Sequence, residues 1–167
     1  MATIITNPAA LRLLRRTGCA ALGLDVSATK IGVAVSDPGL TRGLPLGAIR
    51  REKLDARGAA TRRVSVRIAE AVAAHGAGVV AVGWPLELSG AEGKRCREVR
   101  GFVDDLALAT PVALVDERFS TRAARAALAE AGAPAARGAE DAAAAAAILE
   151  TLLAGLGSAR PSRFFGD

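Results

Sequence analysis

The chain of 167 residues is poor in aromatic residues, and this scarcity restricts how its core can be built. Aromatic residues make up 3% of the sequence, whereas apolar residues make up 51%. The core must therefore consist mainly of alanine, valine, leucine and isoleucine, side chains that suit helices packed closely on a sheet. The length is typical of one domain and is sufficient to bury a substantial core.

Cysteine and histidine are also scarce. The two cysteines, Cys19 and Cys96, fall in a predicted buried strand and a predicted helix, and they suggest neither a disulfide framework nor a metal–thiolate site. A reducing compartment is therefore expected. His75 is the only histidine, which argues against a zinc site of the usual His/Cys type and against a Ser-His-Asp triad. We expect His75 to end a helix and to have no catalytic role.

Long apolar runs are missing, since none approaches the roughly 20 residues of a membrane span, and we expect no membrane partner. The basic stretch at the N-terminus contains Arg12, Arg15 and Arg16 but no acid. We expect a basic leader over 1–19, one domain over 20–157 and a flexible C-terminal tail over 158–167. The expected location is the cytoplasm, with organelle targeting by the leader as the alternative.

Lysine is rare among the basic residues, with 3 lysines against 19 arginines, and the net charge is +5. A basic surface favours polyanionic partners through phosphate contacts and counterion release. A GC-rich genome would produce the same bias toward arginine and alanine, so the charge favours nucleic acid only weakly.

The apolar pattern predicts an α/β fold with a mixed sheet. Strands are expected at 20–25, 31–35, 44–49, 79–82 and 112–115, and helices at 55–75, 91–108, 120–131 and 140–156. Pro45 indicates that the third strand is bent or lies at an edge, and Asp37-Pro38-Gly39 predicts a turn. Two strand–helix–strand crossovers imply parallel strands with helices on the faces of the sheet.

Carboxylates stand where ligands gather in such sheets, at the carboxyl ends of the strands. Asp25 closes the first strand, Asp116 and Glu117 close the last one, and Asp141 opens the final helix. Three carboxylates at one edge would repel one another unless a cation lay between them, and Mg²⁺ prefers such hard oxygen ligands. Two ions about 4 Å apart could hold the attacking water and the leaving oxygen of a phosphodiester, with Asp25 bridging them.

Each acid also has a structural interpretation, which the pattern leaves open. Asp25 could begin a turn, and Glu117 could form a surface ion pair with Arg118. Asp141 could stabilise an alanine-rich helix through the helix dipole. Asp116 is expected to support the strand end. Arg118 could instead neutralise charge in the transition state or pair with one of the three acids.

A second set of residues could bind substrate. Lys94 and Arg95 begin a helix and could hold phosphates, although a solvated helix face is the alternative. Trp84 could stack on an unpaired base or pack under its loop. Ser120 and Thr121 could bind phosphate, although capping a helix is a sufficient role for Ser120.

Four segments together resemble a known family. They are GLDVSATKIGVAVSD at 23–37, VVAVGWPLELSGAEG at 79–93, DERFST at 116–121, and Asp141 followed by alanines and Ile148-Leu149. In this order they resemble the YqgF/RuvX family of pre-16S rRNA nucleases, also described as Holliday-junction-resolvase-like proteins. The resemblance covers about residues 20–156, nearly the whole chain.

The resemblance implies an RNase H-like fold, a mixed five-stranded sheet flanked by helices on both faces. It implies that Asp25, Glu117 and Asp141 are catalytic and bind Mg²⁺ or Mn²⁺. It also implies a role in maturation of the 5′ end of pre-16S rRNA. The expected partner is thus pre-rRNA, or structured DNA as the alternative, with ribosomes or assembly intermediates as further candidates. The protein is expected to be a monomer or a homodimer.

Two positions depart from the pattern of the family. Ser27 replaces a usual glycine, within a changed stretch that includes Lys30, and Ala139 replaces a usual basic residue. Lys30 is still expected to contact substrate. Ser27 could alter the turn, because glycine permits unusual dihedral angles and close substrate approach. Reduced or altered activity is therefore an alternative.

Two other functions remain open on the same fold. A Holliday-junction resolvase would use the same acids but would need a dimer to cut two strands symmetrically. A non-catalytic RNA-binding or ribosome-assembly factor is supported by Ser27 and Ala139. An ATPase of the sugar-kinase or actin type is disfavoured, because Ser27 replaces the glycine of its opening turn and the chain lacks a second nucleotide-binding half.

Overall fold

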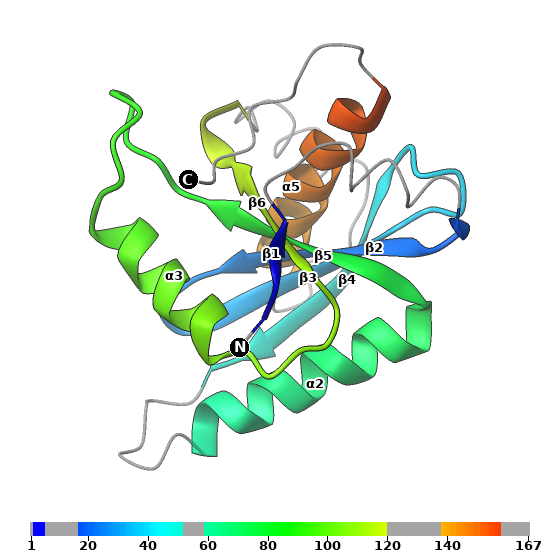
Figure 1. The fold of residues 1–167 in the computed structure, drawn as a ribbon, viewed down its shortest axis with the longest axis horizontal. Helices are drawn as coiled ribbons and strands as arrows, with labels where there is room; N and C mark the ends of the chain where they lie inside the picture. The colour runs from blue at the N-terminus through cyan, green and yellow to red at the C-terminus, as the bar shows by residue number, and fades with distance from the viewer. Residues whose placement is uncertain (1, 6–16, 52–58, 120–137, 158–167) are drawn as a thin grey trace.

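The structure, a computed structural model, describes residues 2–5, 17–51, 59–119 and 138–157. A six-stranded sheet lies at the centre, with the strand order β1-β6-β5-β2-β3-β4 (Figure 1). Its strands are β1 (Ile4–Ile5), β2 (Ala20–Val26), β3 (Lys30–Ser36), β4 (Gly43–Arg50), β5 (Ala77–Trp84) and β6 (Val112–Asp116). The helices are α2 (Ala59–His75), α3 (Lys94–Asp105) and α5 (Ala139–Gly157), and η1 (Glu117–Phe119) is a short 3₁₀ turn.

The sheet is mixed, as predicted. Strands β1, β6, β5 and β2 pair in parallel, whereas β3 pairs antiparallel with both β2 and β4. The carboxyl ends of β2, β5 and β6 therefore meet at one edge, which is where an open α/β sheet collects its ligands.

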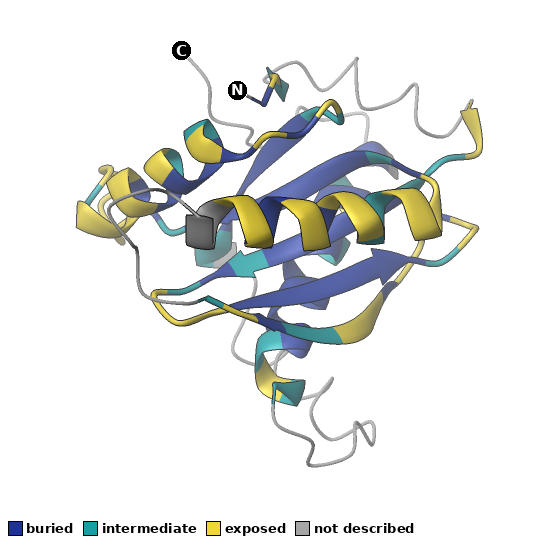
Figure 2. Ribbon diagram, turned by 90° about the horizontal axis from the view of Figure 1, so that it is seen from below, coloured by how far each residue is buried: buried dark blue, intermediate teal, exposed yellow. Residues whose placement is uncertain are grey.

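Helices cover both faces of the sheet, and successive residues of each strand point to opposite faces. Leu22, Leu24 and Val26 pack in the core cluster that contains α2 and α3 side chains. Ala21 packs in a second cluster, with the side chains of α5. Figure 2 shows α2 with its outer face exposed and the sheet behind it buried.

Helix α5 is enclosed along most of its length. Its residues 142–149 are all buried, and it packs against β2, β3 and β4. A helix that is apolar on all sides belongs inside a protein. The alanine run is therefore explained by close approach to the sheet, because small side chains let the helix backbone come near the strands.

The end of α2 and the turn at Asp37 lie where the sequence predicted them. Helix α2 ends at His75, and Gly76 follows with a φ of +61°, the left-handed conformation that commonly ends a helix. Asp37 accepts hydrogen bonds from the backbone of Arg42 at 2.9 Å and from the backbone of Thr41 at 2.6 Å. These bonds, led by the one from Arg42, lower the pKa of Asp37, and they confirm that Asp37 organises a turn.

The predicted strand count of five is wrong, because β1 adds a sixth strand. Ile4 and Ile5 pair with Val112 and Ala113 at the edge of the sheet, within the stretch that was expected to be a leader. A strand of two residues has no periodicity for the sequence to display. Strand β4 occupies the opposite edge, the position that Pro45 predicted.

Some predictions concern residues that the structure does not describe. The expected helix at 120–131, with Ser120 and Thr121, and the expected tail at 158–167 lie outside the described residues. Within the described ranges, no helix is both long enough and apolar enough to span a bilayer.

Candidate active site

Asp25 lies near the carboxyl end of β2, on the face of the sheet that α5 covers. Ala21 packs against α5, and Asp25 has the same orientation because it lies four residues further along the strand. In the antiparallel ladder Asp25 pairs with Gly32 of β3. Asp25 is half-buried and therefore accessible from the edge of the sheet.

Asp141 is brought beside Asp25 by the way α5 begins. A side chain at Gly32 would collide with the backbone carbonyl of Asp141. Since Gly32 pairs with Asp25, the first turn of α5 lies over the strand residue next to Asp25. The glycine is required here because only hydrogen can occupy the space between strand and helix.

Glu117 reaches the same place from the end of β6. Its carboxylate lies over Gly83 of β5, where a Cβ atom would be 2.9 Å from the Glu117 Cδ. In the parallel ladder Leu24 pairs with Val82, so the next residues of the two strands, Asp25 and Gly83, are neighbours. The missing side chain at position 83 therefore leaves room for a carboxylate beside Asp25.

Two cations flank the acids. Lys30 Nζ lies 3.2 Å from Asp141 Oδ2, and the side chains of this pair are 50% and 25% exposed. Lys30 also pairs in register with Arg50 of β4. Together with Ala48 and Gly138 they line a pocket of about 400 Å³. A basic pocket next to an acidic site can bind a phosphate close to the reacting bond.

The three acids offer the oxygen donors that Mg²⁺ or Mn²⁺ prefers; Gly83 leaves space for the carboxylate of Glu117, and Gly32 for the backbone of Asp141. Among the described residues, however, no three or more His, Cys, Asp or Glu side chains are grouped closely enough to hold a metal ion. One oxygen of Asp141 contacts Lys30 instead. The donor types thus suit a hard cation, and Lys30 would compete with a bound ion for one oxygen of Asp141.

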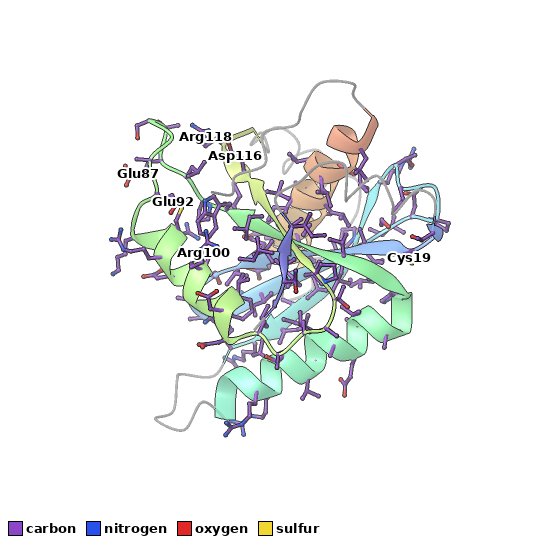
Figure 3. All side chains as sticks on the ribbon, in the orientation of Figure 1. Cys19, Glu87, Glu92, Arg100, Asp116 and Arg118 are labelled. Atoms are coloured by element: carbon purple, nitrogen blue, oxygen red, sulfur yellow. The ribbon has the colours of Figure 1, made fainter. Side chains whose placement is uncertain are left out.

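The neighbouring acid, Asp116, has a different partner. It is 3% exposed, and Arg118 donates to it from its backbone N at 3.0 Å, from Nε at 3.1 Å and from Nη2 at 2.8 Å. These side-chain hydrogen bonds raise the pKa of Arg118. Asp116 therefore supports the strand end, as expected, and fixes Arg118 at the edge that carries Glu117. Figure 3 shows this pair at the end of the sheet opposite Cys19.

Ser27 closes the β2–β3 turn without strain. Its backbone N–H and its Oγ both donate to the carbonyl of Lys30 at 2.9 Å, and its Oγ accepts from the Lys30 N–H at 3.2 Å. Among the described non-glycine residues, only Leu40 has a positive φ. Serine in place of the usual glycine therefore does not distort this turn.

The position of Trp84 corrects the expectation that its side chain binds substrate. The side chain is 1% exposed and belongs to the core cluster, with the Arg100 guanidinium carbon 5.0 Å from its ring centroid. The ring is therefore not available to stack on a base, and the alternative of packing under the loop holds. Its Nε1 is buried without a hydrogen-bond partner in the described part of the chain.

Lys94 and Arg95 are exposed at the start of α3, and Lys94 Nζ lies 3.7 Å from Glu98. Both cations are accessible to a phosphate, so the structure leaves the two predicted interpretations open. Sequence reasoning missed Arg50 and Arg51, which follow each other at the end of β4. Two adjacent arginines at the end of an edge strand do not by themselves indicate a site. Their places beside Lys30 and the β2–β3 turn depend on the pairing of β4 with β3.

Neither cysteine takes part in this arrangement. Both are free of disulfides, as expected. Cys96 is buried, and its Sγ lies 3.3 Å from the carbonyl of Pro85. Burial raises the pKa of the Cys96 thiol, which keeps it protonated and unreactive near neutral pH.

These features define an α/β protein in which Asp25 and Glu117 lie at the carboxyl ends of β2 and β6, and Asp141 opens α5 beside them. Lys30 and Arg50, on the antiparallel strands β3 and β4, add positive charge at the same edge. Among solved structures, Thermus thermophilus RuvC in complex with a Holliday junction substrate superimposes with a TM-score of 0.56 at 19% identity, covering 86% of this chain and 99% of that chain. The fold is therefore RNase H-like.

The sequence comparisons then identify the family. A family model described as "RuvX: Holliday junction resolvase" matches residues 19–155. A protein of Rhodospirillum rubrum named "Putative pre-16S rRNA nuclease" is 42% identical over 149 residues, covering 86% of this chain and 88% of the relative. One of the same name from Paramagnetospirillum magneticum is 40% identical over 136 residues, covering 79% and 83%. The chain belongs to the RuvX family.

Proposed function

We propose that this protein is a metal-dependent nuclease that hydrolyses nucleic-acid phosphodiesters and matures the 5′ end of pre-16S rRNA in the cytoplasm. The observation that supports the proposal is the placement of the acids at one edge of the sheet: Asp25 pairs with Gly32, which the first turn of α5 with Asp141 covers, and the Glu117 carboxylate lies over Gly83. The names of the similar proteins support pre-16S rRNA as the substrate. Ribosome-assembly intermediates are then the natural source of that substrate.

In this proposal, Asp25, Glu117 and Asp141 would hold Mg²⁺ or Mn²⁺. When bound, such an ion neutralises charge on the phosphodiester and activates water for its hydrolysis. The chain itself supplies the ligands and the phosphate contacts. Lys30 and Arg50 lie on the acidic side and would bind the backbone of the nucleic acid there. Lys30 would exchange its contact with Asp141 for a contact with a phosphate.

Arg118 would act as a positioning residue in this mechanism. Four hydrogen bonds tie it to Asp116, directly before Glu117 in the chain. They fix the backbone from which Glu117 extends over Gly83. The pair thus keeps one of the three acids within reach of the other two.

A Holliday-junction resolvase is the second candidate, because the matching family model carries that description. The same acids would serve it, but two copies of the chain would have to act together on a four-way junction. The third candidate, a non-catalytic assembly factor, loses part of its support because Ser27 forms an unstrained turn.

A cleavage assay separates these functions. The purified protein is incubated with a 5′-extended small-subunit rRNA precursor fragment or with a four-way DNA junction, with Mn²⁺, with Mg²⁺ or with a chelator. Asp25→Asn removes one proposed ligand. Asp104→Asn makes the same chemical change in the last turn of α3, away from the acids.

The proposal predicts that the RNA is cut only with metal, that Asp25→Asn abolishes cleavage and that Asp104→Asn retains it. Cleavage of the junction alone would replace the proposal by the resolvase. Tight RNA binding without cleavage of either substrate would favour the assembly factor.

A further inference from the structure

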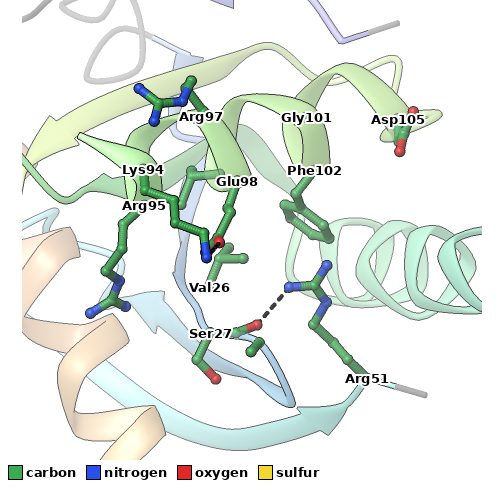
Figure 4. A pocket seen from close by; sticks show the side chains of 12 residues that line it. Val26, Ser27, Arg51, Lys94, Arg95, Arg97, Glu98, Gly101, Phe102 and Asp105 are labelled. Carbon is green, nitrogen blue, oxygen red and sulfur yellow. Dashed lines mark hydrogen bonds and ion pairs between the residues drawn. The ribbon is translucent and has the colours of Figure 1, made fainter. Parts of the chain in front are cut away.

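A second, larger groove lies on the face of β2 opposite the acids. It has a volume of about 750 Å³ and runs between α3 and the β2–β3 turn (Figure 4). Val26, which lines it, directly follows Asp25, and successive strand residues point to opposite faces. The groove and the acidic site therefore meet at the carboxyl end of the same strand.

Basic side chains outnumber acidic ones on the walls of the groove, because Arg51, Lys94, Arg95 and Arg97 line it together with Glu98 and Asp105. Arg51, Lys94 and Arg95 line it from two separate elements, and Val99 and Phe102 contribute apolar surface between them. Figure 4 shows Arg51 and Lys94 on opposite sides of this space. Such a surface can bind the backbone phosphates of a nucleic acid through its basic side chains and a base or ribose through its apolar side chains.

Arg51 is held in position before any ligand binds. Its Nη1 donates to the carbonyl of Ser27 at 2.6 Å, and its guanidinium carbon lies 5.1 Å from the centroid of the Phe102 ring. Both contacts restrict the side chain, so less conformational entropy is lost when it binds an anion. Arg51 is half-buried, and this burial lowers its pKa.

The shape of the groove selects an unpaired strand. Its volume is that of a site for a small organic ligand, and the stacked, paired bases of a duplex cannot enter such a concave space. Unpaired nucleotides can turn a base or ribose toward apolar side chains while their phosphates remain at the rim.

We propose that this groove holds an unpaired segment of the strand that flanks the scissile phosphodiester. Its phosphates contact Arg51, Lys94 and Arg95, and a base or ribose lies on Val99 and the neighbouring apolar surface. The inference rests on the proposed nuclease function. It implies that the strand passes around the carboxyl end of β2, from the face of the acids to the face of α3.

The first test measures binding of a single-stranded RNA oligonucleotide, in chelator so that nothing is cut, over a range of salt concentrations. Arg51→Gln and Lys94→Gln should each weaken binding by roughly fivefold, as expected for one ion pair near the surface. Each should also reduce the slope of log K against log salt by about 0.7, the value for one phosphate contact on a single strand. Arg67→Gln, on an exposed position of α2, is the matched control and should change neither.

The second test reverses the sign, so that unfolding cannot imitate the result. Glu98 lines the groove and lies 3.7 Å from Lys94. Glu98→Gln should strengthen binding of the same oligonucleotide by a few-fold, because it removes a repulsive charge and releases Lys94. Glu70→Gln, exposed on α2, makes the same change away from the groove and should have no effect.

The outcomes separate this inference from the proposed function. If the wild-type protein cuts RNA but the groove variants bind like the α2 controls, the groove inference is overturned and the nuclease function stands. If duplex RNA shows the same dependence on Lys94 and Glu98 as single-stranded RNA, the assignment to an unpaired segment is wrong. If the wild-type protein neither binds nor cuts nucleic acid, both proposals fail. If Arg51→Gln does not fold, the Lys94 and Glu98 variants decide.

Discussion

A single methyl group at position 83 should displace one of the proposed metal ligands. A Cβ atom built on Gly83 would lie 2.9 Å from Glu117 Cδ and 2.6 Å from Ile148 Cδ1, and closer still to the carboxylate oxygen. The atoms in conflict are the ends of flexible side chains, so they can move aside. We therefore expect Gly83→Ala to fold, with a loss of about 1–3 kcal/mol in the free energy of unfolding, the usual cost of overpacking.

The effect on metal binding should exceed the effect on folding. Changes that misplace a ligand commonly weaken metal affinity by about 10- to 100-fold, and Gly83→Ala should weaken Mn²⁺ binding by this amount in calorimetric titration. Urea unfolding measures the stability of the same samples. Gly101→Ala is the matched control, because a methyl group there meets no atom within 4 Å. It lies within α3, so it should stabilise the protein by about 0.5–1 kcal/mol and leave Mn²⁺ affinity unchanged.

A folded Gly83→Ala protein that binds Mn²⁺ as tightly as the wild type would refute this reasoning. Glu117 would then either not be a ligand or would reach the metal from another position than the one over β5.

Three further predictions concern the charged groups around the site. Asp116→Asn should lower the free energy of unfolding by about 2 kcal/mol, because it weakens charged hydrogen bonds with Arg118 at a buried position; an unchanged urea midpoint would contradict this. Lys30→Met should tighten Mn²⁺ binding by up to about fivefold, since it releases Asp141 from an exposed ion pair, and weaker binding would disprove the competition. Because hydrogen bonds lower the pKa of folded Asp37, its stabilising effect exists above the unfolded pKa and is lost as the pH falls. The stability difference between wild type and Asp37→Asn should thus shrink from about pH 5 to about pH 2, and a constant difference in urea unfolding would oppose this.

The strands and helices of the core could be predicted because their apolar patterns are long and regular. The final helix, expected at 140–156, spans Ala139–Gly157. The helix expected at 91–108 is shorter, Lys94–Asp105. Its apolar pattern continues because Leu106 and Leu108 are also buried, although they lie beyond the helix. Burial thus extends the pattern past the residue where the backbone hydrogen bonding ends.

The placement of the three acids at one edge of the sheet could be expected from their positions at strand and helix ends, because parallel strands bring their carboxyl ends to one edge; their grouping into one metal site stays a prediction. Their detailed contacts could not be expected. Lys30 and Asp141 are 111 residues apart in the sequence, and nothing local links them. The burial of Trp84 was equally hidden, since an aromatic residue at the end of a strand has the same local pattern whether it packs inward or faces solvent.

The groove could not be predicted from the sequence for the same reason, as the contacts of Arg51 show. Its contacts with Ser27 and Phe102 join three elements that the chain separates. Charge and spacing identified Lys94 and Arg95 on one helix, because a single helix displays its own pattern. The opposite wall of the groove contains Arg51, which directly follows β4, and only the folded sheet brings it near α3.

The most direct test of the central claim, that Asp25, Glu117 and Asp141 share one metal site, is a calorimetric Mn²⁺ titration of Asp25→Asn, Glu117→Gln, Asp141→Asn and the Asp25/Asp141 double variant. A shared site predicts that each single change weakens Mn²⁺ binding at least about tenfold. It also predicts that the double change costs much less than the sum of the two single losses, because residues that act as a unit are not additive. Wild-type affinity in any one folded single variant would remove that acid from the site and contradict the account.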